Sequence, residues 1–301
     1  MKSAIALDLE WDGASILCAA TCWIDVGFTP EPLLWAAPTA TGYVPLSQAF
    51  LEAFIDTLWQ SHVSGITLVT WGGTSSDWKA LLTACPSREA RLREMALASV
   101  DIPLISVAQT GMMQSLVSVA RATGMSPRSG CELSSDVPRM WKLGSAAQTE
   151  VLRHVQWDAW ATCQLYAKLH AAAQITRPQL TWNTMRSGTR SVRLQRVKRG
   201  EEWCLPTVKD VMEWPPPVSN FPIPPHLHPN ELTKWLREPE PEVAQVAEIS
   251  QVAEISQVAE ISRSLKSRSL KSPRSLKSQS KSPIHGGTDV PHESIQLETP
   301  M

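Results

Sequence analysis

The order of apolar and polar residues predicts strands and helices through the first half of the chain. Short apolar runs at residues 4–9, 16–24 and 66–71 predict buried strands, because none is long enough for a typical helix. Residues 32–36 predict a further short strand. Over residues 46–59, apolar positions recur three and four apart, which predicts a helix with one buried face.

A helical period then continues to about residue 173. It predicts further helices at residues 77–84, 88–98, 114–123 and 146–173. Strands that are joined and followed by helices are typical of a layered α/β domain, with a central mixed β-sheet flanked by helices. We place this domain at residues 1–175.

The composition changes after residue 175. Basic residues outnumber acidic ones in the segment that follows, and the alternation over residues 192–197 predicts an edge strand. Prolines are dense over residues 214–229, which predicts an extended arm without regular structure. We treat residues 176–238 as a basic and proline-rich extension.

The last part of the chain is repetitive. The hexapeptide QVAEIS occurs three times in tandem from Gln245, and the pentapeptide RSLKS occurs three times from Arg263. Solenoid repeats are longer than this, and a basic, serine-rich run cannot bury a core. Residues 239–301 are therefore predicted to be a disordered tail, with docking of a protein partner as one use for it.

Overall composition narrows the class of protein. The net charge of −1 identifies no partner, and a 43% hydrophobic content is enough for a substantial core. The six cysteines include no Cys-x-x-Cys pair, so reduced core thiols are favoured over a zinc site. Neither a signal peptide nor a long apolar run stands out. We expect a soluble intracellular protein without a membrane partner; nucleus and cytoplasm are both left open.

Two carboxylates stand out on the first predicted strand. Asp8 and Glu10 lie two residues apart, so both side chains leave the same face of the sheet. Neighbouring carboxylates on a core strand repel each other unless a cation neutralises them, and hard divalent metals prefer oxygen ligands. The pair indicates Mg²⁺ or Mn²⁺, unless the strand ends near Glu10 and the acids simply reach solvent.

Two further acids open or occupy predicted helices. Asp77 begins a helix shortly after a strand, where an acid that caps the helix is a common alternative. Asp158 lies on the long helix with His154 one turn before it on the same face. A surface His–Asp pair is the alternative there.

Together these motifs resemble the DEDD superfamily of 3′–5′ exonucleases, over about residues 4–170. Asp8-Leu9-Glu10 is similar to the first motif of that family, the segment from Thr70 to Asp77 to its second, and the segment from His154 to Asp158 to its third. Two departures fall in the second motif, where Gly72 replaces an asparagine and Ser76 replaces an aromatic residue. In the third motif, His154 stands at the spacing of the tyrosine branch, so the branch stays open.

The resemblance implies a ribonuclease H-like fold and a metal-dependent 3′–5′ exonuclease acting on the 3′ ends of single-stranded DNA or RNA. It implies a two-metal site for Mg²⁺ or Mn²⁺ held by Asp8, Glu10, Asp77 and Asp158, with His154 as the base that takes a proton from water. Other candidate contacts to nucleic acid are two tryptophans, for which core packing is the alternative, and three arginines of the extension: Trp11, Trp71, Arg190, Arg193 and Arg196. A catalytically inactive nucleic-acid-binding or adaptor protein on the same fold is the alternative function.

Overall fold

The computed structural model describes residues 3–25, 30–126, 136–173, 184–187, 190–215 and 223–237. All of them belong to one compact unit, Met1–Glu240. The predicted tail at residues 239–301 lies outside the described residues.

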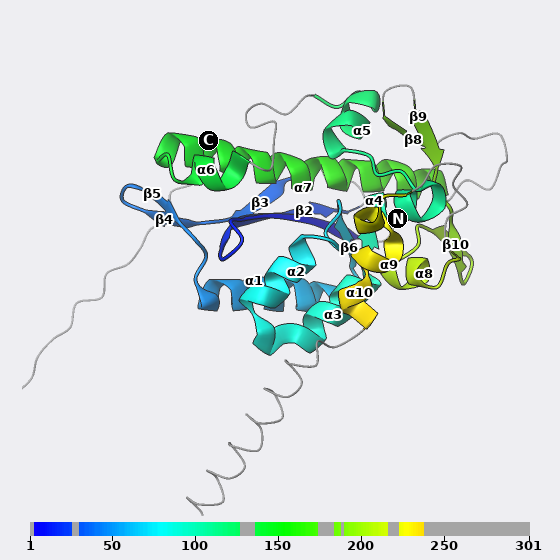
Figure 1. Cartoon of the computed structure of the whole chain (residues 1–301), viewed down its shortest axis with the longest axis horizontal. Coiled ribbons are helices and arrows are strands. Elements are labelled where there is room, and N and C mark those ends of the chain that lie inside the picture. The colour runs from blue at the N-terminus through cyan, green and yellow to red at the C-terminus, as the bar shows by residue number, and fades with distance from the viewer. Residues whose placement is uncertain are drawn as a thin grey trace, which may run out of the picture. The chain divides into compact units, whose positions relative to one another are not determined.

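A five-stranded sheet forms the centre of this unit (Figure 1). Its strands are β1 (Ala4–Trp11), β2 (Ile16–Ile24), β3 (Pro32–Trp35), β6 (Thr67–Thr70) and β7 (Val100–Asp101), in the order β3-β2-β1-β6-β7. The first three strands pair antiparallel, whereas β6 and β7 continue the sheet in parallel. The predicted α/β architecture with a mixed sheet is therefore confirmed.

Helices cover both faces of the sheet. The long helix α7 (Ser145–Ala173) packs along β1 and β2, and Figure 1 shows it crossing one face. Below the other face lie α1 (Gln48–Val63), α2 (Asp77–Ala84) and α3 (Glu89–Ala98). All four helices correspond to helices predicted from the apolar period, with end points that differ by a few residues.

Helix α1 shows how the sequence specifies such an element. Its N-cap is Ser47, whose hydroxyl accepts a hydrogen bond from the backbone N–H of Phe50 at 3.3 Å. The apolar positions of the predicted stripe face the sheet, and those that are buried in the helix are Leu51, Phe54, Ile55 and Leu58. The predicted face is the buried face.

Several elements had no periodic signal. Helix α4 (Ile102–Thr110) was not predicted, because its residues from Ile102 to Ala108 are all buried and no polar face marks the period. The hairpin of β4 (Ala37–Thr39) and β5 (Gly42–Val44) and the helix α6 (Val137–Trp141) are too short for one. Helix α5 (Leu116–Ala122) lies within the predicted range of 114–123.

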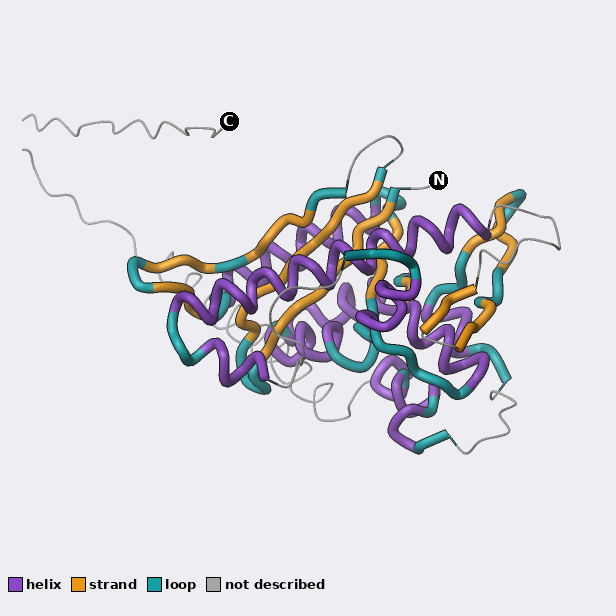
Figure 2. The backbone as a smooth tube through the Cα atoms, turned by 90° about the horizontal axis from the view of Figure 1, so that it is seen from above, coloured by secondary structure: helices purple, strands orange, loops and turns teal. Residues whose placement is uncertain are grey.

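The extension packs against the α/β domain. Two small ladders, β8 (Thr184–Ser187) with β9 (Arg190–Arg193) and β10 (Val197–Arg199) with β11 (Glu202–Cys204), lie at the same end of the unit in Figures 1 and 2. The predicted strand at 192–197 is split between β9 and β10. Apolar side chains of the extension join the main core, among them Leu194, Leu205, Val208, Val211 and Trp235.

The proline-dense stretch at 214–229 differs from its prediction. A 3₁₀ turn, η4, spans Pro225–Leu227, and α9 (Pro229–Leu232) begins at the last proline of the stretch. Proline is tolerated in the first turn of a helix, where its missing N–H would have no helical partner. The prediction that this stretch holds no regular structure was therefore wrong at its end. Two further short helices, α8 (Val208–Met212) and α10 (Lys234–Arg237), flank it.

Two further findings concern membranes and cysteines. Across the part of the chain that the structure describes, no helix combines the length and apolar character that crossing a bilayer requires. Five of the cysteines are free thiols, and Cys18, Cys22, Cys85 and Cys163 are buried. The expectation of reduced core thiols holds for these positions.

Candidate functional site

A cavity of about 610 Å³ opens at the end of β1. All four carboxylates named from the sequence line it, although they come from three separate parts of the chain: Asp8, Glu10, Asp77 and Asp158. The remaining lining residues come from the end of β1, the loop before α2 and the start of α5: Leu9, Trp11, Trp71, Ser76, Met113, Gln114, Ser115, Leu116 and Val117.

Strand β1 supplies the first two acids. Asp8 pairs in register with Ala20 and Glu10 with Cys18, so the two carboxylates leave the same face of the sheet, while Leu9 between them is 4% exposed on the other. Glu10 is only 7% exposed. The alternative in which both acids merely reach solvent is therefore wrong for Glu10.

Helix α7 supplies His154 and Asp158. The Nε2 atom of His154 lies 3.0 Å from Glu10 Oε1 and 3.6 Å from Asp158 Oδ2. The histidine side chain is fully buried, which contradicts the surface His–Asp alternative. His154 is not among the residues that line the cavity, and its ring lies between two acids that do.

Asp77 is the first residue of α2 and is 4% exposed. Its Oδ1 atom accepts a hydrogen bond from the Ser76 hydroxyl at 2.9 Å, whereas Oδ2 is buried without a hydrogen-bond partner. Burial, together with the negative charges of Glu10, Asp101 and Asp158, raises the pKa of Asp77 to about 8, although the Ser76 hydrogen bond acts in the opposite direction. Of the alternative expected here, an N-cap or first-turn acid, the N-cap form is wrong because Ser76 holds that position, whereas Asp77 does lie in the first turn of α2.

Two glycines shape the loop before Asp77. Gly72 has φ +81°, a left-handed conformation that side chains other than glycine rarely adopt. A Cβ atom at Gly73 would lie 2.6 Å from the Cβ atom of Thr70, so no larger residue fits there. Asparagine is one of the few other residues that adopt the left-handed conformation.

Asp101 holds this loop from the adjacent strand. Its Oδ1 atom accepts the backbone N–H of Gly72 at 2.9 Å, and its Oδ2 atom accepts that of Thr74 at 2.8 Å. The residue is 1% exposed, and burial raises the pKa of its carboxyl although these hydrogen bonds act in the opposite direction. The segment from Asp101 to Leu104 lies within the part of the sequence that resembles the exonucleases, but Asp101 was not predicted as a site residue and nothing in the spacing indicated this contact.

The connection between α4 and α5 forms the opposite wall. Met113 is 40% exposed at the rim. Gln114 is 5% exposed, and both polar atoms of its amide are buried without a hydrogen-bond partner. Sequence reasoning missed Gln114 as a site residue: the apolar period places it at the start of the helix predicted at residues 114–123, whereas α5 begins at Leu116.

The two tryptophans named from the sequence differ in their surroundings. Trp11 is 38% exposed at the rim and follows a break in the β1–β2 register after Glu10. Trp71 is half-buried and packs against the core. Of the two, Trp11 presents the more accessible ring to the cavity.

The cavity contains the type of donor that Mg²⁺ and Mn²⁺ prefer, since carboxylate oxygens are hard ligands. The buried Oδ2 atom of Asp77 fits such a role. Across the described residues, however, no group of three or more His, Cys, Asp or Glu side chains is arranged to hold a metal ion. The donor chemistry therefore fits a divalent cation, and the side chains as they lie do not form a closed metal centre.

Comparison with known proteins adds one structural likeness. No family model matches the chain, and no curated protein matches it. A family B DNA polymerase from the hyperthermophilic archaeon Pyrobaculum calidifontis is similar in structure, with 17% sequence identity and a TM-score of 0.43. The match covers 56% of this chain and 24% of the polymerase chain, so this chain spans only a minor part of the polymerase. A likeness of this size assigns no activity to this chain.

The arginines named from the sequence lie in the extension. Arg190 and Arg193 belong to β9, and Arg196 follows that strand. The Arg196 guanidinium lies 5.4 Å from the centre of the Trp203 ring and is not among the residues that line the acidic cavity. A role for these arginines in binding nucleic acid stays a prediction.

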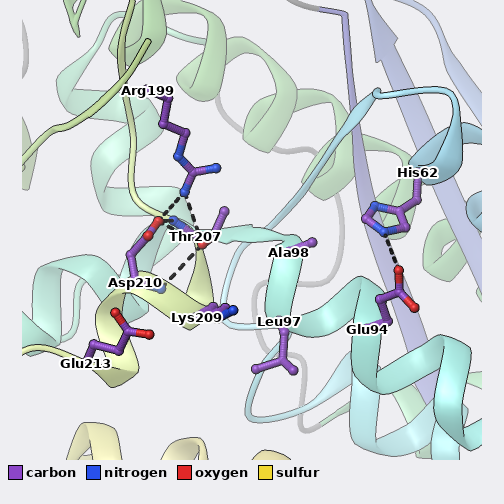
Figure 3. Close-up of a pocket in the computed structure, with 9 residues that line it drawn as sticks. All are labelled: His62, Glu94, Leu97, Ala98, Arg199, Thr207, Lys209, Asp210 and Glu213. Carbon is purple, nitrogen blue, oxygen red and sulfur yellow. Dashed lines mark hydrogen bonds and ion pairs between the residues drawn. The ribbon is translucent and has the colours of Figure 1, made fainter.

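A second cavity, of about 620 Å³, lies between α3 and the extension (Figure 3). Charged side chains of both signs line it and several pair with each other: His62 Nε2 lies 3.5 Å from Glu94 Oε1, and Arg199 pairs with Asp210. The cavity contains none of the residues named from the sequence.

Proposed function

We propose that this chain is a metal-dependent 3′–5′ exonuclease on a ribonuclease H-like fold, which hydrolyses phosphodiester bonds at the 3′ ends of single-stranded DNA or RNA. The observation that carries the proposal is the meeting of Asp8, Glu10, Asp77 and Asp158 in one cavity. Carboxylates that are gathered and partly buried repel each other, so the arrangement calls for a positive partner.

In this proposal Asp8, Glu10, Asp77 and Asp158 would hold two divalent cations. When bound, two divalent cations supply activation of the attacking water and stabilisation of the leaving 3′ oxygen. Trp11 offers its exposed ring for stacking on a base at the rim. The arginines of the extension, Arg190, Arg193 and Arg196, supply positive charge for the phosphate backbone.

The placement of His154 favours a different role from the one that the resemblance implies. A general base needs contact with the water that it deprotonates. His154 is fully buried, and its Nε2 atom lies within 3.0 Å of Glu10 and 3.6 Å of Asp158. We therefore assign it to orienting these two carboxylates.

A test of the function uses the full chain with 5′-labelled single-stranded DNA and RNA in Mg²⁺ or Mn²⁺. We expect products that shorten from the 3′ end, and we expect Asp8→Asn or Asp158→Asn to reduce the rate by about 100-fold or more. The matched control is Asp136→Asn, because Asp136 is an exposed acid that pairs with Arg139 outside the cavity. If neither polymer is shortened, or if Asp8→Asn leaves the rate unchanged, the proposal is wrong.

The second candidate is a catalytically inactive protein on the same fold that binds nucleic acid or acts as an adaptor through its tail. The finding in its favour is that, within the described residues, the acids do not converge as metal ligands. Isothermal titration with Mn²⁺ separates the two candidates. Binding that Asp8→Asn abolishes supports the nuclease, whereas nucleic-acid binding without Mn²⁺ binding supports the inactive protein.

A further inference from the structure

The loop before Asp77, residues 72–76, is fixed by hydrogen bonds to residues elsewhere in the chain as well as by hydrogen bonds within the loop. On one side, Asp101 accepts the backbone N–H groups of Gly72 and Thr74. Within the loop, the Ser75 N–H donates to the Gly72 carbonyl at 3.0 Å. These bonds occupy the backbone N–H groups of Gly72, Thr74 and Ser75, and the partner of the Thr74 carbonyl lies outside the loop.

That carbonyl is bound by a residue near the end of the compact unit. The indole Nε1 of Trp235, in α10, donates to the Thr74 carbonyl oxygen at 2.9 Å, and this hydrogen bond is buried. The two residues are 161 positions apart in the sequence. Because a buried carbonyl that loses its partner is costly, this bond matters for the position of the loop.

Trp235 is itself fixed to α3. The Arg93 guanidinium lies 5.6 Å from the centre of the indole ring and also donates to the backbone carbonyl of Trp235. Figure 1 shows α10 beside α3. Trp235 is 8% exposed, so its ring is enclosed between α3 and the loop.

A movement of the 72–76 loop would also move Asp77. The Trp78 N–H donates to the Gly73 carbonyl at 3.0 Å, so the first turn of α2 is built on the loop. The Ser76 hydroxyl, which has one proton to donate, lies within hydrogen-bond distance of the Gly72 carbonyl oxygen, at 3.1 Å, and of the Asp77 carboxyl, at 2.9 Å. The carboxyl of Asp77 thus takes its position from backbone that Asp101 and Trp235 hold on two sides.

We propose that Trp235 is a positioning residue for the acidic cavity, so that the site is fully formed only while α10 is docked against α3 and the loop. The expected effect of Trp235 on catalysis rests on the proposed function. The expected effect on the stability of the 72–76 loop does not, so the two effects are measured separately.

The test compares Trp235→Phe with the wild-type full chain. Phenylalanine removes the indole N–H and keeps an aromatic ring beside Arg93. The matched control is Trp214→Phe, because Trp214 is a half-buried tryptophan of the same extension that packs on the core. Three quantities are measured: hydrogen exchange of a peptide that spans residues 70–78, the Kd for Mn²⁺, and kcat and KM on single-stranded DNA.

For Trp235→Phe we expect hydrogen exchange in that peptide to be faster by about fivefold, the effect of losing one hydrogen bond. We expect the Kd for Mn²⁺ to rise and kcat to fall by a similar factor of about five, with KM unchanged, because the substrate rim is left intact. Trp214→Phe should change none of the three. Arg93→Gln, which loosens α10 without altering the indole, should move exchange in the same direction.

Unchanged exchange in Trp235→Phe overturns the proposal, whatever the activity shows. An equal increase in Trp214→Phe also overturns it, since the effect would then be a general loosening of the extension. If the wild-type chain neither binds Mn²⁺ nor shortens DNA, the proposed function fails, while the exchange measurement still decides the role of Trp235. If Trp235→Phe does not fold, Arg93→Gln decides the same question by the same measurement.

Discussion

Asp77 shows how strongly the surroundings act on a single residue of this chain. Its pKa rises from 3.8 to about 8 because the carboxyl is buried near other negative charges. A carboxyl whose pKa is higher in the folded chain than in the unfolded chain binds a proton more tightly when folded. Asp77 therefore contributes its full stabilisation below the unfolded pKa of 3.8, and this stabilisation is lost as the pH rises through the folded pKa of about 8.

The expected result is a free energy of unfolding that falls between pH 3.8 and about 8 in the absence of divalent metal. Urea unfolding in a chelator, across this range, measures it. Asp77→Asn should flatten the decrease, since an amide does not titrate. A decrease that persists unaltered in the variant would assign it to other groups.

Gln114 leads to a second prediction at this scale. Its buried amide has no hydrogen-bond partner, so Gln114→Met should raise the free energy of unfolding by about 1 kcal/mol. The matched control is Gln148→Met, because the Gln148 amide bonds the backbone of Tyr43 and Trp141 at 2.9–3.1 Å and is equally buried. That variant should lose stability. Destabilisation of both variants, measured in urea, would contradict the prediction.

Residues on periodic elements could be assigned to the site from the sequence. Asp8 and Glu10 lie two apart on a strand, and His154 and Asp158 lie four apart on a helix, so the period alone fixes a common face. Gln114 could not be assigned, because it lies on a connection where no period relates it to the cavity. The contacts of Asp101 depend on a loop fold that spacing does not encode.

At the scale of elements, the loop between β6 and α2 depends on backbone conformation. Gly72 has φ +81°, and a Cβ atom there would meet only the Ser75 hydroxyl at 3.9 Å, so strain rather than space limits its replacement. Gly72→Ala should lower the free energy of unfolding by about 1–2 kcal/mol. Gly72→Asn should lower it less, because asparagine tolerates this conformation.

Thermal unfolding of both Gly72 variants measures the difference. Gly13→Ala serves as a control for a left-handed glycine in open surroundings, since Gly13 has φ +95° and no neighbour within 4 Å. An asparagine variant that is less stable than the alanine variant would show that the side chain at position 72, and not its φ angle, decides the cost.

Elements with a polar face, or with polar residues at both ends, were predicted from the sequence, and elements with neither were not. The stripe of α1 and the apolar runs of β1 and β2 gave correct positions, because each contrasts a buried face with a polar one or is bounded by polar residues. Helix α4 is buried from Ile102 to Ala108, and β7 has only two residues. The turn η4 and the helix α9 were not predicted, because a high proline content does not show which prolines occupy the first turn of a helix.

At the scale of the whole molecule, the compact unit ends at Glu240. Deletion of residues 241–301 should therefore leave the melting temperature and any nuclease activity unchanged. Deletion from residue 223 should destabilise the unit by several kcal/mol, about 1.5–3 kcal/mol for each large buried side chain lost, because Leu232, Trp235 and Leu236 belong to the core. Calorimetry of the two truncated chains tests this, and equal melting temperatures would contradict it.

The pairing of β1 has a consequence for how the length of this chain can vary. The strand pairs in register with β2 from Ala4 to Glu10 and with β6 over Ala4–Ala6, so its register is fixed up to both carboxylates. Inserting one residue before Asp8 would turn both carboxylates into the apolar layer and Leu9 into the cavity. A one-residue slip of this strand past its neighbours is therefore expected to abolish activity, whereas a two-residue slip restores the face but moves both carboxylates about 7 Å along the sheet.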